Sequence, residues 1–209
     1  MKTYLDIENW NRKEHFYHFK NLGQPYFGFT VNVDVTCAYQ YSKKNNTSIF
    51  ILYLYACMKA VNSIDNLAYR LEQDDKIAVY DKVHVSATIL RPDNTFGFSF
   101  IHFEDTLDKF YNNFIKEKER ILNSSDLFPP VYSEGCIYCT TIPWLNFTSV
   151  DEPMPGNNES IPRVAFGKIT EKNKSYLMPV SIKVNHALLD GFHVSKFFEV
   201  FQNELNKIR

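Results

Sequence analysis

The stretch from Pro179 to Val194 limits the possible folds of this 209-residue chain more than any other. Up to Asn185, apolar residues alternate with polar ones, which predicts a β-strand with one buried face. From Asp190 onward, apolar residues recur every three or four positions, which predicts an amphipathic helix with Asp190 as its N-cap. The apolar positions of this helix are Val194, Phe197, Phe201, Leu205 and Ile208. A one-sided strand followed closely by a one-sided helix favours a sheet with helices packed on it.

His186 lies between these two elements, at a kind of position where side chains often carry chemistry. An imidazole can act as a general base, because its ordinary pKa lies near neutral pH. Asp190, four residues later, could brace the turn or pair with a cation elsewhere in the chain. The alternative is structural: His186 would be a hydrogen-bonded turn residue and Asp190 only a helix cap. The local pattern leaves both interpretations open.

The remainder of the chain predicts strands and helices in mixed order, with no repeats and no linker long enough to divide it. We expect further helices over 8–20, 36–46, 49–62 and 105–122, with Ser48 and Asp105 as the N-caps of the last two. We expect strands over 27–35, 67–71, 77–80, 83–90, 96–101, 136–142, 164–169 and 176–184, and a loop over 150–162. The sequence therefore predicts one α/β (α+β) domain over residues 1–209, a two-layer sandwich of a mixed sheet with helices packed on it.

Composition excludes several classes of protein. Apolar residues make up 44% of the chain and the formal net charge is -1, so we expect neither a disordered chain nor a nucleic-acid-binding surface. The first residues contain no apolar secretory segment, and the apolar run 49–61 is shorter than the roughly 20 residues that span a bilayer. We therefore expect a cytoplasmic protein without membrane contact.

Cys136 and Cys139 have the spacing of a redox or zinc pair. In a strand, residues three apart point to opposite faces, which argues against joint ligation. No second cysteine pair or histidine pair completes a zinc site in the sequence. We expect core thiols here and no metal.

Two motifs at opposite ends of the chain resemble the chloramphenicol acetyltransferase family of coenzyme A-dependent acyltransferases. One is His186-x-x-x-Asp190-Gly191, within the longer run that ends at Val194. The other is the N-terminal string Asn9-Trp10-x-Arg12-Lys13-Glu14-His15-Phe16. Shorter matches, among them Pro143-Trp144-Leu145-Asn146-Phe147, extend the resemblance over essentially the whole chain. The resemblance implies the family's fold, acetyl-CoA as co-substrate, and a homotrimer with its sites at subunit interfaces.

The resemblance also assigns roles to individual residues. His186 would be the general base that takes a proton from an acceptor hydroxyl, which then attacks the thioester of acetyl-CoA without a covalent enzyme intermediate. Asp190 would form a structural ion pair with Arg12. Thr140 occupies the position of a serine that donates a hydrogen bond to the tetrahedral intermediate. Trp144 matches a tryptophan that lines the coenzyme tunnel.

The acceptor site implied by the resemblance is largely aromatic. Phe27 and Phe96 keep aromatic walls of the family site, and an aromatic pair on the first helix becomes His18 and Phe19. In a family trimer, four residues would face His186 of a neighbouring subunit: Phe19, Phe27, Phe96 and Thr140.

Other positions depart from the family pattern. A small residue near Phe96 becomes Phe98, a cysteine position becomes Pro25, and a threonine that helps to hold water near the oxyanion becomes Ala165. These changes leave the acceptor open: it is chloramphenicol, or a different small alcohol acetylated by the same mechanism. A non-catalytic ligand-binding homologue is a third hypothesis, favoured by Ala165 and opposed by the retained His186. The related acyltransferase core of 2-oxo-acid dehydrogenase complexes follows lipoyl domains, and a chain that starts at its first strand disfavours it.

Overall fold

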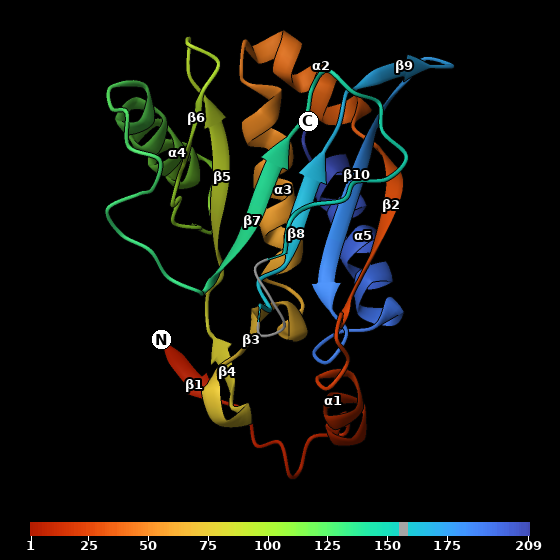
Figure 1. Ribbon diagram of the computed structural model, residues 1–209. Helices are drawn as coiled ribbons and strands as arrows, with labels where there is room; N and C mark the ends of the chain where they lie inside the picture. The colour runs from red at the N-terminus through yellow and green to blue at the C-terminus, as the bar shows by residue number, and fades with distance from the viewer. Residues whose placement is uncertain (155–158) are drawn as a thin grey trace.

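The computed structural model describes residues 1–154 and 159–209. Its main feature is a large mixed sheet. The strands of this sheet are β2 (Tyr26–Asp34), β5 (His84–Leu90), β6 (Phe96–Phe98), β7 (Cys136–Thr141), β8 (Arg163–Phe166), β9 (Thr170–Lys172) and β10 (Ser175–Asn185). They lie in the order β2-β10-β8-β7-β5-β6, with β9 paired to β10. The central strands β5, β7 and β8 are parallel, whereas β10 is antiparallel to both β8 and β2 (Figure 1).

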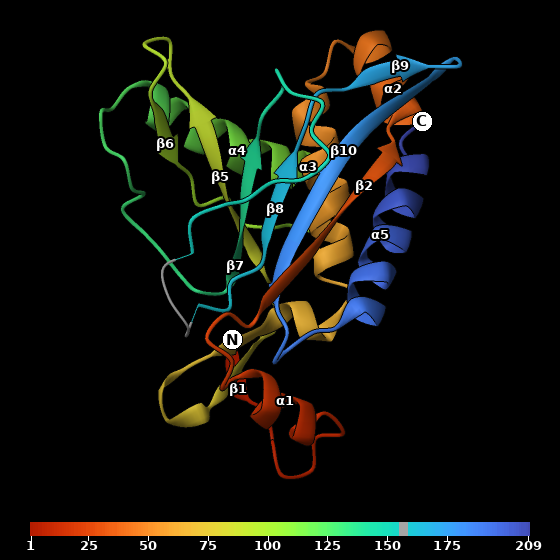
Figure 2. The same cartoon turned by 45° about the vertical axis from the view of Figure 1, so that its right-hand side comes forward.

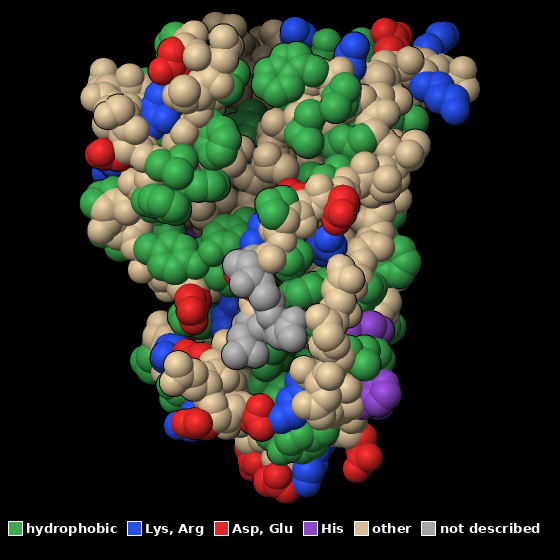
Figure 3. All heavy atoms as spheres, viewed as in Figure 1, with side chains coloured by type: hydrophobic (Ala, Val, Ile, Leu, Met, Phe, Trp, Pro, Cys, Tyr) green, Lys and Arg blue, Asp and Glu red, His purple; other side chains and the backbone are tan. Residues whose placement is uncertain are grey.

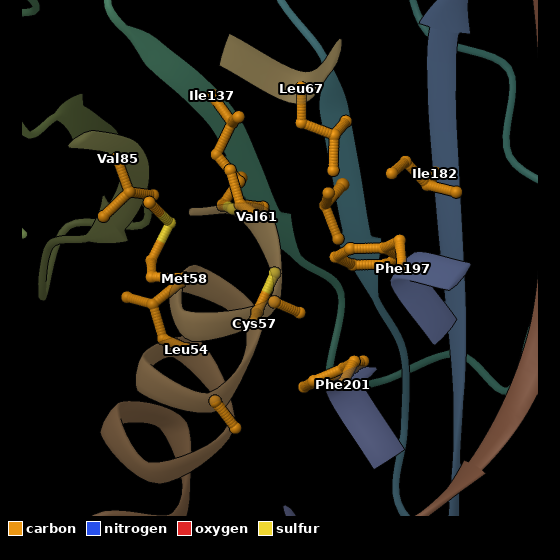
Figure 4. Close-up of a cluster of buried hydrophobic side chains, with 14 of the residues drawn as sticks. Leu54, Cys57, Met58, Val61, Leu67, Val85, Ile137, Ile182, Phe197 and Phe201 are labelled. Atoms are coloured by element: carbon orange, nitrogen blue, oxygen red, sulfur yellow. The ribbon is translucent and has the colours of Figure 1, made fainter. Parts of the chain in front are cut away.

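Helices cover one face of the sheet (Figure 2). They are α2 (Thr36–Asn45), α3 (Ile49–Val61), α4 (Leu107–Leu122) and α5 (Gly191–Asn206). The core lies between the sheet and the central pair of helices. There Met58 of α3 faces Val85 of β5, and Phe197 of α5 lies toward Ile182 of β10 (Figure 4). The segment that follows β7 crosses the opposite face of the sheet (Figure 2).

The strand and helix predicted at the C-terminal end are confirmed. Val180, Ile182 and Val184 of β10 are buried on the helix side of the sheet. The carboxylate of Asp190 accepts a hydrogen bond from the backbone N–H of Phe192 and so caps α5. The mixed sheet with helices packed on it is the architecture that the sequence predicts.

The N-terminal region forms a smaller unit of structure at one end of the large sheet (Figure 1). A three-stranded sheet has the order β1-β4-β3 and is built from β1 (Lys2–Tyr4), β3 (Tyr69–Leu71) and β4 (Ile77–Tyr80). Short 3-10 helices cover Asp65–Ala68 and Gln73–Asp75. The first α-helix, α1 (Lys13–Phe19), begins five residues later than the sequence predicts, because turns occupy the residues before it. Arg12 thereby becomes the N-cap residue of α1.

The predicted helix caps are only partly correct. Ser48 precedes α3 as expected, but its side chain makes no capping hydrogen bond. Thr106, not Asp105, is the N-cap residue of α4, because extended backbone continues one residue further than the sequence suggests. Of the predicted loop 150–162, residues 155–158 lie outside the described residues, and the others form no helix or strand. None of the helices in the described ranges is both long and apolar enough to cross a bilayer.

Candidate active site

His186 is held in one orientation at the end of β10. Its backbone N–H donates a hydrogen bond to the carbonyl oxygen of Pro25, at 2.6 Å. Its ring stacks on Phe19 of α1, with centroids 3.8 Å apart and planes 3° apart. Phe27 of β2 contacts the ring at a centroid distance of 4.4 Å. Two aromatic side chains from separate elements therefore fix the plane of the imidazole.

The two nitrogens of this imidazole have different surroundings. Nδ1 of His186 is buried and has no hydrogen-bond partner among the described residues. The residue as a whole is half-buried rather than sealed in the core. Burial of Nδ1 leaves Nε2 as the ring nitrogen that a substrate can approach. A half-buried imidazole with a fixed plane and one accessible nitrogen has the form of a general base.

The predicted ion pair between Arg12 and Asp190 is present. The Arg12 side chain is 9% exposed and that of Asp190 33% exposed, so the pair lies at the edge of the core. A second guanidinium nitrogen of Arg12 donates a long hydrogen bond, 3.4 Å, to the carbonyl oxygen of His186. Arg12 thus joins the start of α1 to both ends of the turn that carries His186.

Asp190 makes further contacts that hold the same turn. His193 Nδ1 lies 2.8 Å from an Asp190 carboxylate oxygen, and together these residues form a capping box. Burial opposes ionisation of Asp190, but the hydrogen bond and charge of His193 and the charge of Arg12 lower the pKa of its carboxyl below the ordinary value. An ionised Asp190 therefore serves as both helix cap and ion-pair partner, so the two roles that the sequence left as alternatives coexist.

Thr140 lies on a different part of the molecule, on the face of the sheet away from the helices. Ile137 points toward α3 (Figure 4), so Tyr138 and Thr140, at odd spacing from it, point to the opposite face. The Thr140 hydroxyl lies 3.3 Å from that of Thr88 on β5. Its register partner on β8 is Ala165, which is buried and carries no hydroxyl. The chain thus pairs Thr140 with a hydroxyl from β5 and offers none from β8.

A cavity of about 310 Å³ opens beside Thr140. Its walls include Thr88, Phe98, Phe128 and Tyr138, so it is mostly aromatic with a few hydroxyl groups. Phe98 stacks on Phe128 with centroids 5.5 Å apart. Figure 3 shows hydrophobic side chains gathered on this face over β5, β6 and the loop that follows α4. A small molecule with an apolar body fits such a cavity in both size and chemistry.

The cavity and His186 are far apart within one chain. Thr140 pairs with Ala165, and Ala165 pairs with Ser181 of β10, so the three residues lie at one level of the sheet. His186 follows Ser181 by five residues, which places it about 16 Å further along the strand direction. In Figure 1 the arrowhead of β7, near Thr140, and that of β10, near His186, point to opposite ends of the sheet. One chain alone does not bring the imidazole to the cavity.

The sequence model described as chloramphenicol acetyltransferase matches residues 1–202 of this chain. The chain belongs to the chloramphenicol acetyltransferase family. It is accordingly an acyltransferase. A chloramphenicol acetyltransferase of Clostridium perfringens is 29% identical over 204 residues, which cover 95% of this chain and 92% of that protein.

Solved structures agree with this assignment. A chloramphenicol acetyltransferase structure superposes with a TM-score of 0.90 at 27% identity, covering 98% of this chain and all of that one. A probable dihydrolipoamide acetyltransferase of Listeria monocytogenes has a TM-score of 0.65 at 17% identity, covering 93% of this chain and 89% of that one. The second likeness shows a shared fold alone.

The structure separates the predicted acceptor residues of the family site. Phe19 and Phe27 contact His186 of their own chain, because α1 packs against the end of β10. That they also face the histidine of a neighbouring subunit stays a prediction. His18 is exposed and contacts Phe19 rather than His186.

Other predicted residues lie nearer the cavity or at the surface. Phe98 lines the cavity itself. Phe96 is 44% exposed, and its ring centroid lies 5.4 Å from that of Phe98. Trp144 is 65% exposed just beyond β7 and has no ring partner in the described ranges. Pro25 is buried and serves as the backbone acceptor for His186.

Sequence reasoning missed several residues of the cavity wall, among them Thr88, Tyr138, Glu152 and Arg163. Thr88 stands at a polar position of an alternating strand, which is a signal that it faces the open side of the sheet. The strands of Tyr138 and Arg163 do not alternate and give no such signal. No pattern in the sequence predicts that Glu152, in the segment after β7, lines the cavity.

The cysteines behave as core thiols. Cys136 and Cys139 are both buried, and all four cysteines are free. Burial raises the pKa of Cys136 to about 12, against the opposing charge of Arg70. Burial, with a contact to Cys57, also raises the pKa of Cys139. Thiols held this far from ionisation are poor nucleophiles.

Proposed function

We propose that this chain transfers an acetyl group from acetyl-CoA to a hydroxyl group of chloramphenicol or a related small alcohol. His186 acts as the general base. Its Nε2 takes the hydroxyl proton while the alcohol oxygen attacks the thioester carbonyl. The tetrahedral intermediate then collapses, the carbon–sulfur bond breaks, and the coenzyme A thiolate takes the proton from the imidazolium. No bond to the protein forms, and no metal is required.

The observation that carries this proposal is the fixed imidazole. Stacking on Phe19 and contact with Phe27 hold the plane of the ring, and burial of Nδ1 leaves one nitrogen available. Arg12 and Asp190 tie the turn on either side of the ring. A base held in one orientation before the substrate arrives lowers the entropic cost of proton transfer.

Thr140 supplies the second part of the proposed machinery. Its hydroxyl lies at the cavity beside that of Thr88, and the pair can place one O–H donor toward a developing oxyanion. Ala165 offers no second donor from β8. The side chain of Trp144, exposed beyond the end of β7, is our candidate for contact with the coenzyme.

The distance between His186 and the cavity supports a site shared between two copies of the chain. The imidazole of one subunit would meet Thr140 of its neighbour, and three such contacts would close a homotrimer. We expect this assembly to work in the cytoplasm, where acetyl-CoA is available. The shared site makes a direct prediction for mixtures of variants.

Release of coenzyme A thiol from acetyl-CoA, with chloramphenicol as acceptor, tests the reaction. His186→Gln should abolish release while leaving the fold intact, and His15→Gln, at an exposed histidine outside the site, should leave it unchanged. Wild-type turnover by His186→Gln would refute the proposed mechanism.

A complementation experiment tests the shared site. In trimers assembled from equal amounts of His186→Gln and Thr140→Val chains, chance pairing gives about one interface in four that joins an intact base to an intact cavity. Activity of the mixture should therefore rise well above that of either variant alone. If each site belonged to a single chain, mixing would restore nothing.

A further inference from the structure

The cavity beside Thr140 carries a charged group that an uncharged acceptor would leave without a partner. Glu152 lines the wall of the cavity and is half-buried. Its carboxylate makes no hydrogen bond or ion pair with any other described residue. Burial raises the pKa of Glu152, opposed by the charges of Arg163 and Lys183. A carboxylate in this position is stabilised by a cation that enters the cavity.

The nearby cations of the protein are already paired with other acids. Arg163 has a guanidinium nitrogen 3.8 Å from Glu159 and lies over the ring of Tyr138 at 5.1 Å. The ammonium of Lys183 lies 2.9 Å from Asp151. Two acids therefore match these two cations, and Glu152 remains as an unmatched negative charge.

Arg163 adds one more requirement for a ligand. Its Nε is buried and donates to no acceptor among the residues that the structure describes. A buried N–H without a partner favours a ligand that brings an oxygen close to it. The cavity wall thus presents a carboxylate for a cation and an N–H for an oxygen, beside aromatic rings and a few hydroxyl groups.

We propose that the acceptor of this chain is an amino alcohol with an aromatic body, whose ammonium group binds Glu152. This inference rests on the proposed acetyl transfer and names its substrate class. The aromatic body packs against Phe98 and Phe128, and an oxygen of the ligand accepts from Arg163. The hydroxyl that is acetylated lies toward Thr140. Chloramphenicol, which carries an uncharged amide in place of an amine, would then be the poorer acceptor.

The test compares chloramphenicol with its dimethylamino analogue, in which a tertiary amine replaces the dichloroacetamide group. The tertiary amine is cationic but forms no stable amide, so thiol release reports O-acetylation alone. The wild-type protein should show the higher kcat/KM for the amine. Glu152→Gln should lower that preference about tenfold, the effect of removing one hydrogen bond to a charged group. Glu199→Gln makes the same substitution at an exposed residue of α5, outside the cavity wall, and should leave the preference unchanged.

Calorimetric binding of both compounds without acetyl-CoA separates this inference from the acetyl-transfer proposal. If the wild-type protein binds the amine more tightly than chloramphenicol and Glu152→Gln does not, the inference about Glu152 is supported. If no thiol is released in the same experiment, only the proposal of acetyl transfer is overturned. The inference is overturned if the wild-type protein prefers chloramphenicol in both assays. It is overturned equally if Glu152→Gln keeps the full preference for the amine.

Discussion

The ion pair between Arg12 and Asp190 can be tested separately from the helix cap, because Asn caps helices as well as Asp does. Asp190→Asn keeps an acceptor for the N–H of Phe192 and removes the charge that pairs with Arg12. Breaking a fully buried pair costs about 3–5 kcal/mol. Since the Asp190 side chain is one-third exposed, we expect about 2 kcal/mol for this pair. Asp190→Ala removes the cap as well, and should cost about 1 kcal/mol more.

Urea unfolding at one fixed protein concentration measures both costs, because subunit association would otherwise shift the midpoint. Arg12, which pairs with Asp190, also donates a hydrogen bond to the carbonyl oxygen of His186. Loss of the pair in Asp190→Asn should therefore loosen the position of His186 and lower kcat more than it changes KM. A free energy of unfolding for Asp190→Asn within about 0.5 kcal/mol of the wild type would refute the argument that this pair stabilises the turn.

The same variant predicts a pH dependence. The pKa of Asp190 is lowered in the folded chain, so its stabilisation is fully present above the ordinary carboxyl value of 3.8. It is lost as the pH falls through the lower folded-state pKa, where the carboxylate becomes protonated. The stability that the wild type has over Asp190→Asn should therefore shrink as the pH falls below 3.8. A difference that persists undiminished in strong acid would contradict the assignment of the effect to charge.

Three further variants test other contacts. Phe19→Ala removes the ring stacked on His186 and should lower kcat about tenfold, which corresponds to the upper end of the free energy of one aromatic pair. Tyr17→Ala, on an exposed face of the same helix, is its control. Equal effects of the two variants on kcat would argue against the stacking role. Thr140→Val keeps the side-chain shape, loses the donor, and should lower kcat about a hundredfold in the thiol-release assay; an unchanged kcat would remove Thr140 from the mechanism. Phe201→Ala opens a hole in the core between α5 and the sheet and should lower the free energy of unfolding by about 3–5 kcal/mol in urea; a loss below about 1 kcal/mol would mean that the core closes around it.

The sequence predicted the part of the site that depends on neighbouring residues. The alternation up to Asn185 and the helical spacing after Asp190 are local patterns, so they fixed the turn that carries His186. The Arg12–Asp190 contact joins residues 178 apart, and only the family resemblance suggested it.

The cavity could not be predicted in the same way, because it depends on the order of the strands. β5, β7 and β8 are neighbours in the sheet but are separated by long segments of chain, so Thr88, Tyr138 and Arg163 meet only after folding. Periodicity indicates which side of a sheet Thr88 faces and does not show which strands are adjacent. The stacking of Phe19 on His186 was missed for a related reason: the direction in which α1 packs is a tertiary choice.

The two halves of the proposed site are held by different kinds of contact, so a change of acceptor need not disturb His186. His186 is held by a backbone hydrogen bond to Pro25, by the stacked ring of Phe19 and by the tilted ring of Phe27, and the ion pair between Arg12 and Asp190 holds its turn. A substitution at any of these contacts should disturb the proposed base. Cavity residues such as Phe98 and Arg163 project from the open face of the sheet, away from the core that α3 and α5 bury. A side chain on that face can be exchanged without repacking the core. Our proposal that Glu152 selects the acceptor therefore requires no change in the fold or in the surroundings of His186.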